Sequence, residues 1–158
     1  LYNCDFYTKL PNKWRSKADL TISVDAFDHF DDPALILNIM HDTLKAKGVA
    51  MISFGPPWRH PLGGHLFSVF PWAHLILSEA SLIKWRNLFI QDGAEKFEEV
   101  EGGLNRMTIK DFENYVENSP FEILSMKFVP ISGFSWFQNL LGREFFTSCI
   151  QATLIKRA

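Results

Sequence analysis

The sequence predicts one α/β domain, because three consecutive segments form a strand–helix–strand pattern. Apolar and polar side chains alternate in residues 18–24, as in a buried strand. Residues 33–47 carry apolar side chains at helical spacing, and residues 49–54 form the short apolar run of a strand buried on both faces. A strand, a helix and a strand with short joints make a βαβ unit, so we expect two parallel strands with a right-handed crossover.

The helix of this unit has both ends marked in the sequence. Asp32 is suited to cap its N-terminus, and Pro33 suits the first helical position. Lys45 and Lys47 complement the helix dipole at the far end, and we expect Gly48 to end the helix. The apolar face consists of Leu35, Ile36, Ile39, Met40 and Leu44.

The rest of the chain adds helices and strands to an elaborated middle. A helix is predicted over residues 72–91, and another begins after Thr108, which forms a capping-box pattern with Asp111. Strands are predicted over residues 121–129 and 145–155. No internal repeat or low-complexity tract appears, which agrees with one domain.

Composition and charge exclude several classes of protein. The chain has 158 residues, 47% hydrophobic and 22% charged, with a net charge of -2. These values are those of a globular domain and not of a disordered tail, a collagen-like repeat or a disulfide-stapled miniprotein. Because no basic stripe with interleaved aromatics exists, we expect no nucleic-acid partner.

The cysteines and the ends of the chain bear on where the protein works. Cys4 and Cys149 lie far apart without C-x-x-C spacing, which favours two reduced thiols in a cytoplasmic protein. The longest apolar stretch, residues 66–77, is shorter than the ~20 apolar residues that a membrane span needs. The chain opens at Leu1 without a signal-peptide pattern, so we expect it to be a piece of a longer chain or one whose start was removed.

The order of these segments resembles a known family. Asp5 before the pair at residues 10–11, the strand at residues 18–24 and then His29 follow the pattern of class I S-adenosylmethionine-dependent methyltransferases, of the type 11 kind. Three later stretches resemble the same family: residues 44–48, residues 105–108 before a helix, and residues 121–123 after it. The resemblance extends over essentially the whole chain, although each motif alone is weak.

The resemblance implies a Rossmann-like methyltransferase fold that is partial. The chain would supply strands four to seven of the family's sheet with their helices, as one partial domain of residues 1–158 with an aromatic-rich insert at about 56–104. The family's glycine-rich loop after its first strand has no counterpart here, since no G-x-G occurs. We therefore interpret the chain as the C-terminal portion of an enzyme, carrying one wall of the cofactor site and inactive alone.

The resemblance also implies cofactor-binding residues for S-adenosylmethionine. Asp5 and Phe6 match the adenine position, and Val24, Asp25 and Ala26 match the methionine end of the cofactor. The alternatives are an ordinary surface turn for the first pair and a loop that caps the next helix for the others. His29 matches a position near the reacting end, where it could remove a proton as the catalytic base; the alternative is a histidine that only packs beneath the site.

Substrate contacts are predicted in and beyond the loop after residue 54. His60 and His65 flank a Pro-Leu-Gly-Gly turn, and their alternatives are a structural loop or two metal ligands. No third ligand has a helpful spacing, so no metal site is predicted. Trp58 could line a substrate pocket or belong to the core, and Arg106 could bind a substrate carboxylate or phosphate or remain solvated.

Two functions follow from these observations. The first is transfer of a methyl group from S-adenosylmethionine to a small-molecule acceptor; the oligomeric state stays open. The second is a non-catalytic module whose aromatic segment, residues 66–89, docks on a partner or a membrane surface. The sequence argues against a serine hydrolase, because the nucleophile pattern G-x-S-x-G is absent and residues 133–135 supply only its first half.

Overall fold

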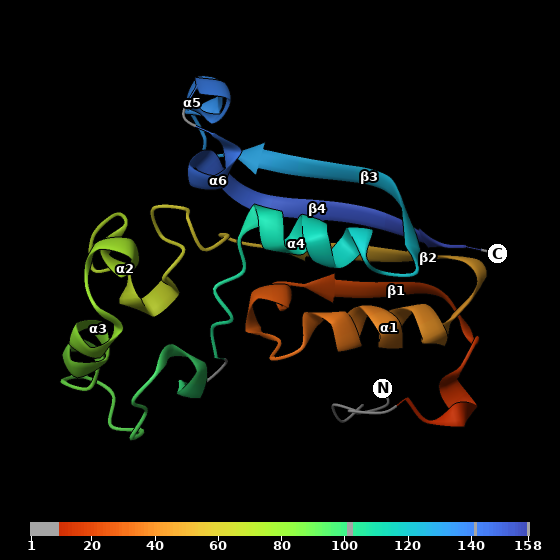
Figure 1. The fold of residues 1–158 in the computed structure, drawn as a ribbon, viewed down its shortest axis with the longest axis horizontal. Coiled ribbons are helices and arrows are strands. Elements are labelled where there is room, and N and C mark those ends of the chain that lie inside the picture. The colour runs from red at the N-terminus through yellow and green to blue at the C-terminus, as the bar shows by residue number, and fades with distance from the viewer. Residues whose placement is uncertain (1–9, 101–102, 141, 158) are drawn as a thin grey trace.

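The computed structural model describes residues 10–100, 103–140 and 142–157, and a four-stranded sheet forms its centre (Figure 1). The strands are β1 (Ala18–Val24), β2 (Leu44–Phe54), β3 (Phe121–Pro130) and β4 (Thr147–Lys156). Their order across the sheet is β1-β2-β4-β3. The β1–β2 pair is parallel and the other two pairs are antiparallel, so the sheet is mixed.

The predicted βαβ unit is confirmed. Helix α1 (Pro33–Thr43) connects β1 to β2, and the Asp32 carboxylate caps it by accepting a hydrogen bond of 2.9 Å from the Leu35 N–H. Pro33 occupies the first turn, where its missing N–H costs no hydrogen bond.

The predicted end of this helix at Gly48 is wrong, because α1 ends at Thr43 and β2 begins at Leu44. Pairing with β1 extends the strand backwards: Leu44 lies opposite Ala18, and an irregularity in register follows. At Gly48 a Cβ atom would lie 2.9 Å from both a Leu44 side-chain carbon and the Lys45 carbonyl oxygen. The glycine is therefore needed for a close approach within the strand and does not cap a helix.

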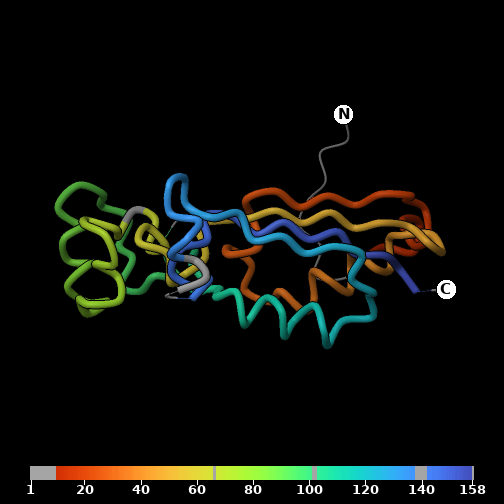
Figure 2. The backbone as a smooth tube through the Cα atoms, turned by 90° about the horizontal axis from the view of Figure 1, so that it is seen from above, coloured from red at the N-terminus to blue at the C-terminus, as the bar shows by residue number. Residues whose placement is uncertain are grey.

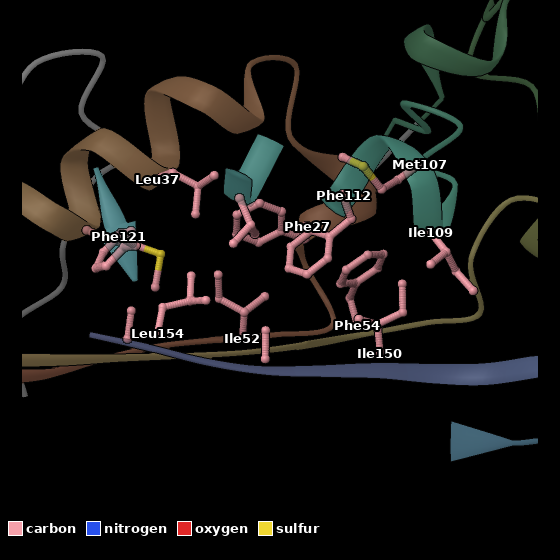
Figure 3. Close-up of a cluster of buried hydrophobic side chains, with 14 of the residues drawn as sticks. Phe27, Leu37, Ile52, Phe54, Met107, Ile109, Phe112, Phe121, Ile150 and Leu154 are labelled. Carbon is pink, nitrogen blue, oxygen red and sulfur yellow. The ribbon is translucent and has the colours of Figure 1, made fainter. Parts of the chain in front are cut away.

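Helices α1 and α4 (Ile109–Glu117) cover one face of the sheet, as the view from above shows (Figure 2). Their apolar faces meet the inward side chains of β2 and β4 in one core (Figure 3). The predicted capping box at the start of α4 is confirmed, with Thr108 and Asp111 bonded reciprocally. The fully buried members of this core include Phe27, Leu37, Leu44, Phe54, Ile109, Phe112, Ile150 and Leu154.

The opposite face of the sheet carries no helix among the described residues (Figure 2). Leu20, Ile22 and Val24 of β1 are 45%, 62% and 60% exposed, and Met51 of β2 is 46% exposed. The expectation of a buried strand at residues 18–24 is therefore wrong, since the apolar side chains of β1 point to the bare face. The expectation that residues 49–54 are buried on both faces is wrong for the same reason: burial alternates along β2 because only one face is covered.

The described residues of the segment 56–104, the lobe, lie beyond the end of the sheet to which β1 points (Figure 1). The lobe contains α2 (Ala73–Ile76) and α3 (Glu79–Arg86) in place of the single helix predicted over residues 72–91. Ser78 separates them, because its side chain caps α3 by accepting from the Ser81 N–H. A second apolar cluster holds the lobe together; it consists of Phe67, Leu82, Ile83, Ala94, Phe97, Val100 and Leu104.

The C-terminal part follows the prediction except at one boundary. Strand β3 agrees with the predicted strand at residues 121–129, and β4 begins at Thr147 instead of residue 145 because Arg143–Phe146 form a helical turn, α6. A further short helix, α5 (Ser135–Leu140), precedes it. Over the described part of the chain, no helix has the length and apolar character needed to cross a membrane.

Candidate functional site

Three segments meet near the carboxyl ends of the parallel strands β1 and β2. They are the loop after β1 (residues 25–31), the loop after β2 (residues 55–65) and the return segment from the lobe (residues 103–107). The crevice beyond the carboxyl ends of parallel strands is where α/β folds bind ligands.

The loop after β1 is fixed to the sheet and to the core. Asp25 has a left-handed backbone (φ 48°) and its N–H donates to the Ser53 carbonyl at 2.8 Å. Phe27 is fully buried and packs edge-on against Phe112, with ring centres 5.5 Å apart. The anchored aromatic ring sets where the following residues, Asp28 and His29, present their side chains.

Asn105 ties the return segment to this loop. Its side-chain amide donates to the carbonyls of Phe27 and Phe30, both at 2.8 Å, and its main-chain N–H donates to the Asp28 carbonyl at 3.0 Å. Asn105 thus supplies hydrogen bonds to three main-chain carbonyls of the loop after β1, which no strand or helix ladder pairs.

His29 has a defined tautomer when neutral. Its Nδ1 lies 2.6 Å from the Gly103 carbonyl oxygen, and because a carbonyl only accepts, Nδ1 carries the proton. Nε2 then holds the lone pair, and it lies 3.8 Å from Oδ2 of Asp28. His65, from the loop after β2, places its Nε2 3.1 Å from the same carboxylate oxygen.

His29 also borders two hollows in the surface. One has a volume of about 490 Å³ and the other about 400 Å³. The larger is lined by Asp25, Ala26, His29, Phe30, Asp31, Glu98 and Gly103. Three carboxylates line this hollow, so a cationic group is the ligand chemistry that it favours.

His60 and His74 are buried within the lobe as neutral side chains. Burial, with a smaller contribution from His74, lowers the pKa of His60 to about 4. Its Nδ1 accepts a hydrogen bond of 3.0 Å from the Leu62 N–H, which a proton on that atom would break. Burial also lowers the pKa of His74, whose Nε2 donates to the Trp58 carbonyl at 2.6 Å.

Trp58 and Arg106 already have partners in the protein. The Trp58 ring packs edge-on against His74 and Phe97. The Arg106 guanidinium lies 5.8 Å from the Trp58 ring centre and donates to the Glu79 carboxylate at 2.6 Å. A substrate anion at Arg106 would have to compete with this ion pair.

The structure brings some of the predicted site residues together and leaves others apart. Asp25, Ala26 and His29 share the larger hollow, and His65 reaches the same loop through Asp28. Val24 belongs to the bare sheet face and is 60% exposed, whereas His60 lies inside the lobe. The predicted adenine-binding residues Asp5 and Phe6 lie outside the described residues.

Asp28, Asp31 and Glu98 are site residues that sequence reasoning missed. Asp28 stands beside His29 in the sequence and is 4% exposed, and this adjacency was the one available signal. Glu98 comes from a charged stretch of the lobe that has no motif, and only the fold carries it to the hollow.

Comparison with solved structures identifies the fold. An S-adenosylmethionine-dependent methyltransferase from Mesorhizobium loti matches with a TM-score of 0.51 and 17% identity, over 90% of this chain and 63% of that one. One from Methanosarcina mazei matches with a TM-score of 0.50 and 15% identity, over 95% and 64%. The chain has the methyltransferase fold. The [4+2]-cyclase SpnF matches as well, with a TM-score of 0.55 and 10% identity over 99% and 55%.

These likenesses concern the fold alone, because the identities are low. The chain spans between about half and two thirds of the length of these three structures, 55–64%. No family model and no curated protein matches the sequence. A cyclase among the similar structures means that activity has to be argued from the site and not from the methyltransferase fold.

Proposed function

We propose that the chain is the C-terminal portion of a class I, type 11-like methyltransferase that acts on a small molecule in the cytoplasm. The observation that carries the proposal is the hollow at the carboxyl end of β1, lined by Asp25, Ala26 and His29, in a fold shared with S-adenosylmethionine-dependent methyltransferases. The three residues are those that the sequence pattern assigns to the cofactor's methionine end and to catalysis.

The residues of the hollow fit the charge of the cofactor. S-adenosylmethionine supplies a methyl group on a cationic sulfonium, and its amino-acid end carries an ammonium. Asp25, Asp31 and Glu98 line the hollow with carboxylates, which attract both cationic groups. Asp25 would bind the ammonium, since its main chain is fixed to β2 by the hydrogen bond to Ser53.

His29 serves in this proposal as the base that accepts the proton lost by the acceptor. Its Nε2 carries the lone pair because Nδ1 donates to the Gly103 carbonyl. The imidazolium formed at Nε2 is 3.8 Å from the Asp28 carboxylate, which stabilises the positive charge. The remaining contribution is positioning, because methyl transfer needs the acceptor lone pair aligned with the sulfonium carbon.

The proposal retains only one of the four predicted substrate contacts, which were Trp58, His60, His65 and Arg106. His65 packs edge-on against His29, with ring centres 5.3 Å apart, and is the contact that we retain. The other three bind protein groups, so an acceptor that used them would displace an existing contact.

The bare sheet face supports the view that the chain is part of a larger enzyme. Leu20, Ile22 and Val24 form an exposed apolar row on β1, which is also an edge strand of the described sheet. Such a row and a free edge favour association with further structure. We propose that the missing strands and the glycine-rich loop lie against this edge and face.

A titration with S-adenosylhomocysteine, the demethylated cofactor, tests the proposal. For the chain as printed we expect no binding tighter than roughly 10 μM, about −7 kcal/mol, because one wall of the site is missing. The protein that includes the segment encoded upstream should bind more tightly. Equally weak binding by the longer protein would contradict the proposal.

Matched variants of the longer protein locate the site. Asp25→Asn should weaken the binding of S-adenosylhomocysteine about 10-fold or more, because it removes a charged hydrogen bond worth roughly 1.5–3 kcal/mol. Asp19→Asn is the control: Asp19 lies near the start of β1, at the other end of the strand from Asp25, and pairs with the exposed Lys45. Equal effects of both substitutions would remove Asp25 from the cofactor site.

The alternative, a non-catalytic docking module, has one observation in its favour. Ile76, Leu88 and Phe89 of the lobe are 68%, 73% and 72% exposed. The basic face needed for a membrane surface is weaker than the sequence indicates, because Arg86 is buried and pairs with Asp92, leaving Lys84 as the exposed basic residue of α3. A docking module would leave S-adenosylhomocysteine unbound in the longer protein too.

A further inference from the structure

Asp28 is a buried acid without a hydrogen bond to its side chain. The residue is 4% exposed, and neither carboxylate oxygen has a hydrogen-bond partner among the described residues. Taking a carboxylate out of water without pairing it is costly, so such a group needs a cation next to it. Two imidazole nitrogens face the carboxylate, and both come from loops at the carboxyl ends of β1 and β2.

The two histidines point donor atoms of metal-ligand type at the carboxylate. Nε2 of His65 is 3.1 Å from Asp28 Oδ2, and Nε2 of His29 is 3.8 Å from it. One ligand atom from each residue lies within 4.8 Å of the other two. In a tetrahedral zinc site with bonds of about 2.0–2.1 Å, neighbouring ligand atoms lie roughly 3.4 Å apart. Rotation of the two imidazole rings would bring the three ligand atoms to this separation.

The hydrogen bond from His29 to Gly103 leaves its other ring nitrogen facing Asp28. Because Nδ1–H donates to the Gly103 carbonyl at 2.6 Å, a neutral His29 directs a lone pair at an acceptor, the Asp28 carboxylate. Two acceptors that face each other need a cation between them, either a proton on Nε2 or a metal ion. A backbone carbonyl that holds the far nitrogen is also how proteins orient a metal-bound imidazole.

We propose that Asp28, His29 and His65 bind a divalent transition-metal ion, with Zn²⁺ as the preferred ion. Imidazole and carboxylate ligands suit zinc, and three protein ligands leave a fourth coordination position, as in catalytic zinc sites. Since His29 also lines the hollow of about 490 Å³, the ion lies beside the space available to a ligand. An acceptor oxygen or nitrogen, or a water molecule, would take the fourth position.

The metal site is inferred without use of the proposed methyl transfer, although the two roles of His29 exclude each other. An ion on Nε2 occupies the lone pair that would otherwise accept a proton, so with the ion bound His29 is a ligand and not a base. Binding of the ion is measured without cofactor or acceptor. A failure of metal binding therefore leaves the titration with S-adenosylhomocysteine unaffected, and the reverse also holds.

The first test is a titration of the tag-free chain, freed of metal by chelation, with Co²⁺ followed by Zn²⁺. We expect one Co²⁺ per chain with visible absorption bands, displaced by one equivalent of Zn²⁺, and a zinc dissociation constant tighter than about 10 μM. No saturable binding of one ion per folded chain would overturn the proposal.

Variants and histidine signals identify the ligands. Asp28→Asn and His65→Gln should weaken zinc binding by about 100-fold or more, which exceeds the 10–100-fold typical of outer partners. His41→Gln is the control, since His41 lies at the end of α1 and pairs with Asp42 outside the cluster. Equal affinity in all three variants would overturn the assignment of the ligands.

A measurement on the unmodified chain avoids the problem of a variant that does not fold. The chain has five histidines, and long-range ¹H–¹⁵N spectra resolve the two ring nitrogens of each. Zinc should shift the Nε2 signals of His29 and His65 and leave His41, His60 and His74 in place. Shifts confined to the other three histidines would contradict the site.

Discussion

The sheet body and the lobe bury different kinds of side chain. The body, formed by β1 to β4 with α1 and α4, packs its apolar core between helices and sheet. The lobe encloses a smaller apolar cluster and also buries His60, His74 and Arg86. Among the described residues, the buried polar side chains outside the lobe are Asp28 and Thr147. The stability of the body thus rests mainly on apolar contact, whereas that of the lobe depends also on protonation state.

The largest expected effect is a substitution in the body core. Phe112→Ala should lower the free energy of unfolding by about 3–5 kcal/mol, because it removes a fully buried ring that contacts Phe27 and Phe54 and leaves a cavity. Urea unfolding followed by circular dichroism measures the change. Phe89→Ala, at a ring that is 72% exposed in the lobe, is the control and should cost far less; similar losses would remove the contrast in burial.

Acid should weaken the lobe before the body. The folded state keeps His60 neutral down to a pKa of about 4, while the unfolded state takes up a proton near 6.5. The contribution of His60 to stability is therefore constant above pH 6.5 and falls as the pH drops from 6.5 to 4, by at most about 3 kcal/mol. Burial lowers the pKa of His74 in the same direction.

Hydrogen exchange by region measures this acid effect. At pH 5, after correction for intrinsic rates, peptides of the lobe should lose protection relative to pH 7.5 more than peptides of β2 and β4. His41 in the body also has a pKa lowered by burial, but it is only partly buried and should contribute less. A uniform loss of protection across both regions would contradict the comparison.

A smaller effect is expected at the start of α4, the helix that covers the body core. Thr108→Ala removes the side-chain acceptor of the capping box and should cost about 1 kcal/mol. The Tm measured by circular dichroism should fall by a few degrees. Thr108→Ser, which keeps the hydroxyl, should stay close to the original; an equal loss in both would show that the methyl group and not the cap matters.

The smallest effect belongs to the bare sheet face. Ile22→Ser in the chain as printed should change the free energy of unfolding by less than about 0.5 kcal/mol, because the side chain is 62% exposed. Ile52→Ser, on the covered face and 2% exposed, is the matched comparison and should be strongly destabilising. In a longer protein whose added segments cover this face, Ile22→Ser should become costly, and an unchanged small effect there would argue against such cover.

Local signals sufficed for much of the fold. The Asp32 cap, Pro33 and the Thr108–Asp111 box depend on residues close in sequence, and all three are confirmed. The expected end at Gly48 was wrong because pairing with β1 outweighs the helix signal of residues 44–47. The single helix predicted for the lobe was wrong because Ser78 starts a new helix. Long-range pairing and competing caps are what a periodicity argument omits.

The candidate site was predicted less completely. Residues adjacent to β1, such as Asp25 and His29, could be located because a loop after a parallel strand lies at the ligand-binding edge. The contact between Asp28 and His65 could not, because the turn around Gly63 and Gly64 decides where His65 points. Glu98 reaches the hollow through the return of the lobe, which carries no sequence pattern.

The lobe leaves and rejoins the body at one point. The Trp58 N–H donates to the Met107 carbonyl at 2.8 Å, so the entry and the exit of this excursion are hydrogen-bonded to each other. The entropic cost of closing a loop rises only slowly with its length, as long as the two ends stay in contact. We therefore expect the lobe to tolerate insertions and deletions while the sheet beneath it keeps its register.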